Sequence, residues 1–168
     1  MNREIRVERS GDIPAIREVN RLAFGRGNEA RLVDDLRSGA YVRLSLVTER
    51  EGKTIGHVMF SALSIEAKRG SVEALALAPV AVVPELQGQG VGSALIREGL
   101  RRCVDAGYDA VIVLGDPDYY SRFGFSSSLA GKLRSRYSGE AFMALELMPR
   151  ALDGVEGDVI YPSPFEDA

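Results

Sequence analysis

A glycine-rich turn between an apolar run and an amphipathic segment constrains the fold more than any other part of this sequence. The run SVEALALAPVAVVP, residues 71–84, has the composition of a strand that is buried on both faces. The turn ELQGQGVGS follows, and residues 91–107 then place apolar side chains at helical spacing and end at a glycine. Another apolar segment, DAVIVLGD, occupies residues 109–116. This order predicts a strand–helix–strand crossover, which joins two parallel strands.

The segments around this crossover predict further helices and antiparallel strands. In chain order they are a half-buried strand (4–9), two helices (10–24 and 28–39), a hairpin (44–66) with its turn at Glu51–Lys53, a short helix ending at Gly124, and a strand (140–147). Together with the crossover they predict a mixed α/β fold. Proline cannot donate to a strand ladder, so Pro79 predicts that the long apolar strand bends or parts from a neighbour near its middle.

The length and composition predict one main domain. The chain has 168 residues, of which 45% are hydrophobic, enough to bury a single core. We expect this domain to span residues 1–150. Residues 151–168 are acidic and contain two prolines, so we expect a tail with little regular structure beyond a short strand at Val159–Tyr161.

Charge and cysteine content argue against several function classes. The net charge of −3 offers no basic excess for nucleic acid, and no apolar run has the length of a leader core or a membrane span. Cys103 is the single cysteine and cannot form an internal disulfide, which fits a reducing compartment. With His57 as the single histidine, a zinc site would need mostly carboxylate ligands. We therefore expect a cytoplasmic protein without a metal that binds neither nucleic acid nor membrane.

The glycines of the turn predict a site for a phosphate group. The first turn of a helix has backbone N–H groups without internal partners, and the helix dipole adds positive charge there. Gly88, Gly90 and Gly92 carry no Cβ, so an anion can approach these amides closely. A P-loop would need a lysine before Ser93, and a dinucleotide fingerprint would need a third glycine or alanine at Ser93. A plain flexible loop that caps a core helix is the remaining alternative.

Two motifs resemble the GNAT superfamily of N-acetyltransferases. QGQGVG, residues 87–92, matches the signature Q/R-x-x-G-x-G/A, and YYSRFGF, residues 119–125, is similar to the family's Tyr-x-x-x-Gly-Phe segment. The longer string LGDPDYYSRFGF resembles a subgroup of small bacterial members. The predicted order of elements agrees with this family over nearly the whole chain. The resemblance implies a central mixed sheet of about six to seven strands, splayed between the fourth and fifth, with about four flanking helices.

The resemblance also implies how a cofactor would be bound. Acetyl-coenzyme A would place its pyrophosphate on the glycine turn and its pantetheine arm between the splayed strands, without a metal. A backbone N–H at Val82 or Val83 would polarise the thioester carbonyl, and Tyr120 would act as the general acid toward the departing thiolate. The cofactor-binding residues implied in this way are Val82, Val83, Gln87, Gly88, Gln89, Gly90, Val91, Gly92, Ser93 and Tyr120.

The general base does not follow from the family pattern. Some members carry a glutamate ten residues before the signature glutamine, but this chain has Leu77 there. Glu73 would share a strand face with Leu77 by period-two counting, and His57 has a suitable ordinary pKa. Both residues also have a non-catalytic explanation: Glu73 as a solvated residue at the end of a strand, and His57 as a packed side chain. Many members also carry a pantetheine-binding asparagine where this chain has Val113.

The expected activity is acetyl transfer from acetyl-coenzyme A to a primary amine by direct attack. Three alternatives stay open: a non-catalytic acyl-coenzyme A sensor, an acyltransferase with another acyl chain or an oxygen acceptor, and a dinucleotide-dependent oxidoreductase. The acceptor would be a small-molecule or peptide amine, bound by the first two helices, their connecting GRGNEA loop and the segment after Phe125. The protein would be a monomer or a homodimer.

Overall fold

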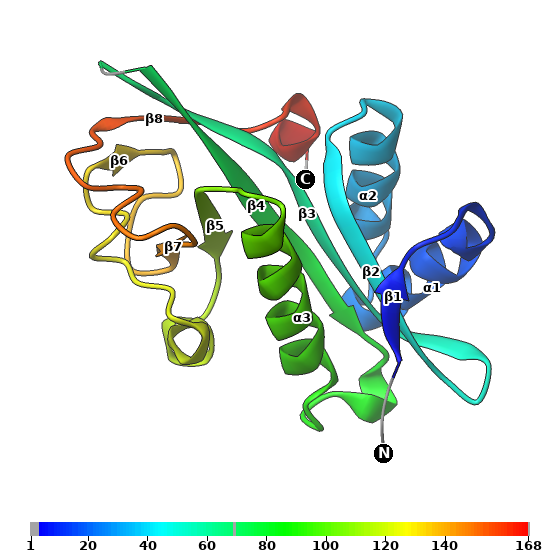
Figure 1. Cartoon of the computed structure of the whole chain (residues 1–168). Coiled ribbons are helices and arrows are strands. Elements are labelled where there is room, and N and C mark those ends of the chain that lie inside the picture. The colour runs from blue at the N-terminus through cyan, green and yellow to red at the C-terminus, as the bar shows by residue number, and fades with distance from the viewer. Residues whose placement is uncertain (1–3, 69, 168) are drawn as a thin grey trace.

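The computed structural model, which describes residues 4–68 and 70–167, is built on one sheet in the order β1-β2-β3-β4-β5-β7 (Figure 1). The strands are β1 (Ile5–Val7), β2 (Val42–Arg50), β3 (Lys53–Ala67), β4 (Gly70–Val82), β5 (Ala110–Leu114), β6 (Leu133–Arg134), β7 (Phe142–Glu146) and β8 (Gly157–Ile160). The α-helices are α1 (Ile13–Phe24), α2 (Asn28–Ser38), α3 (Val91–Asp105) and α4 (Pro117–Tyr120). The mixed α/β fold is confirmed, and the described residues form eight strands where about six to seven were expected.

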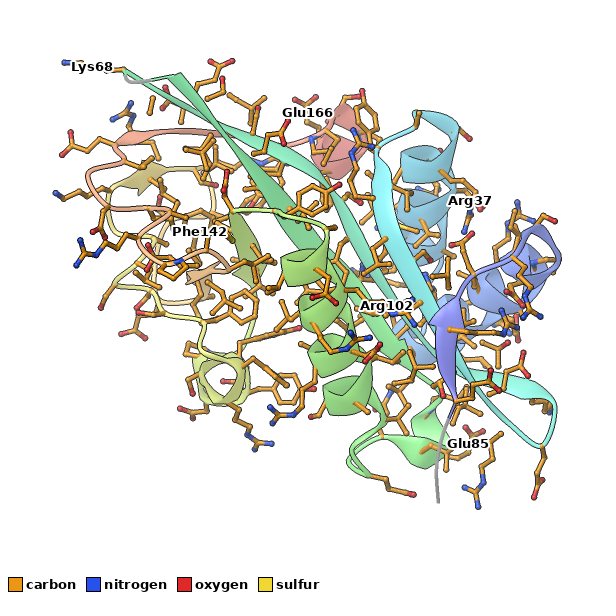
Figure 2. All side chains as sticks on the ribbon, viewed as in Figure 1. Arg37, Lys68, Glu85, Arg102, Phe142 and Glu166 are labelled. Carbon is orange, nitrogen blue, oxygen red and sulfur yellow. The ribbon has the colours of Figure 1, made fainter. Side chains whose placement is uncertain are left out.

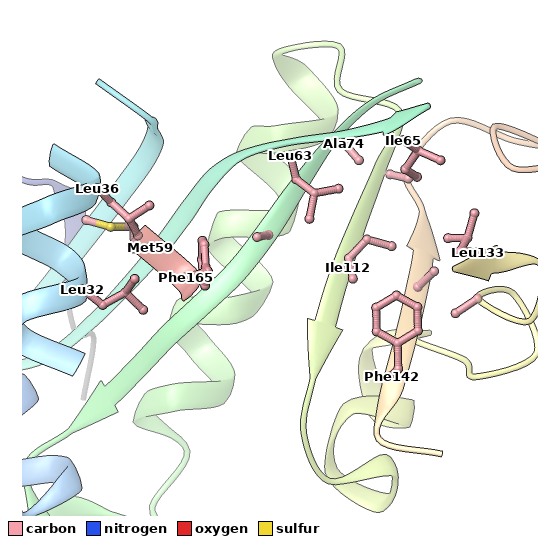
Figure 3. Close-up of a cluster of buried hydrophobic side chains, with 14 of the residues drawn as sticks. Leu32, Leu36, Met59, Leu63, Ile65, Ala74, Ile112, Leu133, Phe142 and Phe165 are labelled. Atoms are coloured by element: carbon pink, nitrogen blue, oxygen red, sulfur yellow. The ribbon is translucent and has the colours of Figure 1, made fainter. Parts of the chain in front are cut away.

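The helices cover opposite faces of the sheet, with α1 and α2 on one side and α3 on the other (Figure 1). The alternation of β4 explains this arrangement, because successive side chains of a strand point to opposite faces. Ala74 and Ala76 belong to the core under α1 and α2, whereas Leu75 and Leu77 belong to the core under α3. Figure 3 shows the first of these cores, where side chains of α2, the sheet and the C-terminal segment meet.

The splay predicted between the fourth and fifth strands is present. The parallel pairing of β4 with β5 extends only from Ala74 to Ala76, and within the described residues β4 then continues to Val82 without a partner on that side. A register shift on the β3 side places Ala78 and Pro79 opposite Met59, which is a β-bulge. Pro79 therefore lies where the strand bends, as its missing N–H predicts.

The C-terminal segment is part of the domain instead of a tail with little regular structure. Strand β8 pairs with Ser64–Ala67 of β3, on the edge that β2 leaves after Ser61, and it overlaps the short strand expected at Val159–Tyr161. A 3-10 helix at Ser163–Asp167 follows and lies beside α2 (Figure 1). Apolar side chains of this acidic segment are buried against the domain, and Phe165 is only 8% exposed.

Charged side chains surround the two cores. Lys68, Glu85 and Glu166 lie at the periphery of the molecule (Figure 2). On α3, Arg102 and Glu98 form an ion pair at 3.0 Å on the outer face of the helix. No helix of the described ranges is long and apolar enough to cross a membrane.

Candidate functional site

The glycine turn leads from β4 into α3 through a 3-10 turn at Pro84–Leu86. Gly88 and Gly90 have φ angles of 76° and 86°, in the left-handed region that L-residues avoid. A Cβ at either position would meet no atom within 4 Å, so both glycines border open space. Gly92 differs, because a Cβ there would lie 3.3 Å from the hydroxyl of Tyr119. Glycine is thus required at positions 88 and 90 by the positive φ angle, and at position 92 by the close approach of the Tyr119 side chain.

Most backbone amides of this turn form no hydrogen bond with the described residues. The N–H of Gln87 donates to the carbonyl of Pro84 at 3.3 Å, and the N–H of Ala94 donates to the carbonyl of Gly90 at 3.0 Å. For the N–H groups from Gly88 to Ser93, the described part of the chain offers no hydrogen-bond acceptor. Unpaired amides at a helix start, next to open space, form a ready site for an anion.

Side chains hold this turn in place. The side-chain amide of Gln87 donates to the carbonyl of Val82 at 2.9 Å, which ties the turn to the end of β4. The hydroxyl of Ser93 lies 3.3 Å from that of Tyr119, which joins α3 to α4. The first residue of the signature therefore has a structural contact of its own.

A cavity of about 380 Å³ opens beside the turn. The predicted cofactor-binding residues that line it are Val82, Gln87, Gly88, Gly90, Gly92, Ser93 and Tyr120. Val83, Gln89 and Val91 are not among its lining residues, and the side chain of Val91 is buried in the core under α3. The side-chain amide of Gln89 donates to the carbonyl of Glu85 at 3.3 Å, so neither Gln89 nor Val91 contributes a side chain to this cavity.

Six lining residues were not among the predicted cofactor-binding residues, and two of them, Tyr119 and Arg122, have polar side chains. Tyr119 contributes its ring and hydroxyl, and Arg122 stacks its guanidinium 5.5 Å from the centre of that ring. Arg122 is the one charged residue among the described residues that line this cavity, and it is a cation. Both belong to the YYSRFGF motif, close to Tyr120, and their position in this motif could have indicated that they contact the cofactor.

The sequence left the N–H groups of Val82 and Val83 as alternative donors to the thioester carbonyl, and among the described residues only that of Val82 has no acceptor. The N–H of Val83 donates to the carbonyl of Ile55 at 3.0 Å. Because amide directions alternate along an antiparallel strand and Val82 faces Gly56, the N–H of Val82 points away from β3. The contact between Gln87 and the Val82 carbonyl agrees with this direction. Val82 thus presents its N–H on the side where β4 and β5 part.

Tyr120 lies at the junction of two cavities. Its ring packs so closely on Gly115, the residue after β5, that a Cβ there would overlap the ring, so this glycine makes room for Tyr120. Phe125 stacks edge-on at 5.8 Å between ring centres. Burial, and secondarily the neighbouring Tyr119, raise the pKa of Tyr120 to about 12. The hydroxyl is therefore protonated at neutral pH.

A second cavity of about 380 Å³ lies on the other side of Tyr120. It shares Phe24, Val80 and Tyr120 with the first, so these three residues stand where the two cavities meet. Its remaining lining residues are Arg26, Asn28, Glu29, Leu32, Ala76, Leu77, Ala78, Pro79, Ile112, Leu114, Tyr137, Tyr161 and Phe165. The lining residues of this cavity belong to the first two helices, their connecting loop and the segment after Phe125, which are the regions expected to bind the acceptor, and to the splayed strands. Below, the two spaces are named the turn cavity and the inner cavity.

The two predicted base candidates lie elsewhere. Glu73 lies on the same strand face as Leu77 but four residues away, or about 13 Å along the strand, and it lines a third groove with Arg43 and Tyr108 instead of either cavity. His57 is fully buried and lines none of these three cavities. Neither residue is therefore placed to accept a proton beside Tyr120.

His57 is instead a packed histidine. The side-chain amide of Asn20 donates to the carbonyl of Ile16 at 3.0 Å and to Nδ1 of His57 at 3.1 Å, so Nε2 carries the ring proton and donates to the hydroxyl of Ser45 at 2.9 Å. Burial, helped by the positive charge of Arg37, lowers the pKa of His57 to about 3. This neutral histidine connects α1 to the sheet.

Comparison with known proteins gives a consistent result. Residues 4–128 match the family model described as an acetyltransferase (GNAT) domain. The chain is 41% identical over 164 residues to the uncharacterized N-acetyltransferase YhbS of Escherichia coli K12, covering 96% of this chain and 97% of that protein. A second relative, the uncharacterized N-acetyltransferase YjhQ of the same organism, is 42% identical over 123 residues, which cover 72% of this chain and 68% of that protein.

Two solved structures resemble the whole fold. The crystal structure of Escherichia coli YhbS in complex with CoA superposes with a TM-score of 0.90 at 39% identity and covers 99% of this chain and 93% of that one. A GNAT family acetyltransferase from Brucella melitensis in complex with acetyl-CoA gives a TM-score of 0.81 at 36% identity, with 98% of each chain covered. With the glycine turn, the splayed strands and these matches together, the chain belongs to the GNAT superfamily of acetyltransferases.

Proposed function

We propose that this protein is an N-acetyltransferase that moves an acetyl group from acetyl-coenzyme A to a primary amine by direct attack. The observation that carries the proposal is the pair of cavities that meet at Phe24, Val80 and Tyr120. One cavity is bordered by unpaired amides and the other is lined by the segments expected to bind the acceptor. Such an arrangement brings two substrates together at one point, which converts a bimolecular reaction into a positioned one.

The residues of the turn cavity fit acetyl-coenzyme A. The amides from Gly88 to Ser93 would hold its pyrophosphate, and the cation of Arg122 adds a favourable charge. The free side of β4 after Ala76 would accept the pantetheine amides, as an exposed strand edge accepts a peptide. The CoA and acetyl-CoA complexes of the two relatives support this assignment. When bound, acetyl-coenzyme A supplies an activated acetyl group and a thiolate leaving group.

Tyr120 and Val82 are the residues that we assign to the chemical step. The N–H of Val82 would donate to the thioester carbonyl as negative charge develops on its oxygen. Tyr120, protonated at neutral pH because its pKa is raised to about 12, would donate to the departing sulfur. Such a weak acid gives up its proton only when another replaces it, and the attacking nitrogen becomes acidic as the new C–N bond forms. We therefore assign Tyr120 a relay role between nitrogen and sulfur.

We propose a small-molecule or peptide amine as the acceptor, and a cytoplasmic location and a monomeric or dimeric state stay predictions. The non-catalytic sensor would keep the turn cavity but has no use for the inner cavity. The presence of the inner cavity on the other side of Tyr120 therefore favours an enzyme.

The test measures the release of free CoA thiol with a colorimetric thiol reagent, using acetyl-coenzyme A and a panel of primary amines. Wild-type protein should release CoA with at least one amine. Tyr120→Phe should lower kcat about 100-fold or more, because a positioned acid typically contributes 10² to 10⁴. Its Kd for CoA, from calorimetry, should change less than about threefold, since a single hydroxyl contact is lost.

Tyr108→Phe is the matched control, because Tyr108 is also partly buried but lines neither cavity. Unchanged turnover in Tyr120→Phe would remove Tyr120 from the mechanism. Tight CoA binding without release for any amine would favour the sensor.

A further inference from the structure

The inner cavity is mainly apolar and aromatic. Phe24, Tyr137, Tyr161 and Phe165 contribute aromatic rings, and the strands contribute small apolar side chains around Pro79. Tyr161 stacks edge-on with Tyr137 at 5.5 Å and tilts against Phe165 at 5.4 Å between ring centres, so the rings form one connected wall. A cavity of this kind favours an aromatic or branched apolar group over an extended polar chain.

One ion pair supplies all the formal charge among the described residues of this wall. Arg26 donates to Glu29 at 2.6 Å, and no other charged residue lines the cavity. The exposures of the partners differ strongly, since the side chain of Glu29 is 12% exposed and that of Arg26 is 63% exposed. The carboxylate is thus built into the wall, whereas its arginine partner lies largely in solvent.

This asymmetry makes the ion pair exchangeable. An exposed arginine contributes little to such a pair, because water and salt screen it and its side chain gains freedom when released. An ammonium group that enters the cavity can take its place on Glu29 without leaving a buried charge unpaired. The incoming amine therefore finds a carboxylate whose present partner is easily displaced.

We propose that the acceptor is a primary amine carried on an aromatic or branched apolar body, and that the carboxylate of Glu29 binds its ammonium group. The inference rests on the acetyltransferase function proposed above and names its acceptor class. It also supplies the base that Glu73 and His57 do not. Glu29 takes one proton from the ammonium, the neutral amine forms the C–N bond, and the C–S bond breaks. The second nitrogen proton reaches the sulfur through Tyr120, and Glu29 passes the first to water.

The number of carboxylates in the cavity wall favours an acceptor with a single ammonium group over a polycation. A polyamine or an aminoglycoside brings several ammonium groups, and this wall offers one carboxylate. Each further ammonium would lose its hydration beside aromatic rings without a charged partner, which is costly. The cavity should therefore discriminate against such amines.

A purely structural reading of Glu29 makes a different prediction. Glu29 also lies in the first turn of α2, where a carboxylate stabilises the helix dipole. If this were its entire role, removing either partner of the ion pair would have effects of the same sign on amine binding. If Glu29 binds the amine, then Glu29→Gln should weaken binding and Arg26→Gln should strengthen it, because the competing cation is gone.

The experiment is a calorimetric titration of 2-phenylethylamine, and separately of spermidine, into protein saturated with CoA. Wild-type protein should bind 2-phenylethylamine at least about tenfold more tightly than spermidine, and Glu29→Gln should weaken that binding about tenfold or more, as expected for a lost charged hydrogen bond. Arg26→Gln should tighten it a few-fold. Glu18→Gln is the control, because Glu18 forms a pair of the same spacing with Arg21 on α1 and lines neither cavity.

The same amines are then used with acetyl-coenzyme A in the thiol-release assay. Binding in the expected order without CoA release would refute the proposed acetyl transfer and leave the amine site standing. CoA release with spermidine or kanamycin in preference to 2-phenylethylamine would leave the transfer standing and overturn the acceptor class. Absence of 2-phenylethylamine binding, or effects of the same sign in Glu29→Gln and Arg26→Gln, would also overturn the inference.

Discussion

The turn cavity and the inner cavity are built in different ways. The turn cavity is bordered by the backbone amides of one continuous segment, Gly88 to Ser93, and its polar side chains come mainly from two short motifs, QGQGVGS and YYSRFGF. The inner cavity owes its character to side chains from α1, α2, the splayed strands and the C-terminal segment, which the fold brings together. A site made of backbone leaves a short glycine signature in the sequence, whereas a site made of scattered side chains leaves none. The following predictions test this contrast.

The largest effect is expected at the inner cavity, in Phe165→Ala. Phe165 is 8% exposed and packs in the core under α1 and α2. Removing its ring should lower the free energy of unfolding by about 3 kcal/mol, from lost burial and the space left behind. The Kd for CoA should stay within about twofold, since the unpaired amides lie in the other cavity. Urea unfolding and calorimetry measure the two quantities. A stability loss below about 0.5 kcal/mol, typical of a surface position, would mean that the C-terminal segment is a detachable tail after all.

The turn cavity should respond in the opposite way to Gly90→Val. Because a Cβ at Gly90 meets no atom within 4 Å, the fold loses only the cost of a left-handed L-residue, about 1–2 kcal/mol. The side chain would fill space intended for the pyrophosphate, and the Kd for CoA should rise about 100-fold, or 2.7 kcal/mol. Gly11→Val is the control, because Gly11 also borders open space but lies in the turn before α1. An unchanged Kd in Gly90→Val would show that the phosphate binds elsewhere.

His57 connects α1 to the sheet on the side of the inner cavity, and its lowered pKa makes the stability of the fold depend on pH. Its pKa is lowered from 6.5 to about 3 in the folded protein, so below pH 6.5 the unfolded chain binds a proton that the folded one does not. The free energy of unfolding should therefore fall as the pH drops from 6.5 toward 3, with a contribution from His57 of up to about 1.4 kcal/mol per pH unit. Urea titrations at several pH values measure the slope. His57→Gln should reduce it by that amount, and an equal slope in both proteins would contradict the assignment.

A smaller effect is expected where the turn meets β4. Gln87→Ala removes the side-chain contact to the carbonyl of Val82, an exposed hydrogen bond of about 1 kcal/mol. The Kd for CoA should rise about fivefold, because the free turn becomes less ordered. Gln87→Glu should weaken binding further, since a carboxylate cannot donate to the carbonyl and repels the pyrophosphate. Calorimetry at constant salt measures both variants, and tighter binding in Gln87→Glu would contradict this reading.

The region of the turn cavity was predicted well from the sequence. The apolar run, the glycine signature and the amphipathic helix are contiguous, so local patterns were enough to place β4 and α3. Pro79 predicted a bend or a parting near the middle of β4, and the resemblance to the family placed the splay between the fourth and fifth strands. The prediction of Val83 as an alternative donor to Val82 failed for a physical reason. The register of β3 against β4 decides which amides are free, and a bulge at Ala78 and Pro79 sets that register only in the folded sheet.

The inner cavity was harder to predict from the sequence. Glu29 and Phe165 lie 136 positions apart in the printed sequence, yet both line the inner cavity. Composition suggested a tail after residue 150, because acidic residues and prolines concealed a few apolar side chains that are buried. His57 was correctly weighed as a packed residue, but its partners Asn20 and Ser45 belong to other elements and could be found only in the fold.

The most direct test of the central claim is a crystal structure of this protein with acetyl-coenzyme A. The pyrophosphate oxygens should accept hydrogen bonds from amides between Gly88 and Ser93, at about 2.7–3.2 Å. The thioester should lie between the N–H of Val82 and the hydroxyl of Tyr120, with the acetyl group facing the inner cavity. A pyrophosphate bound away from α3, or an acetyl group that faces away from the inner cavity, would contradict the account.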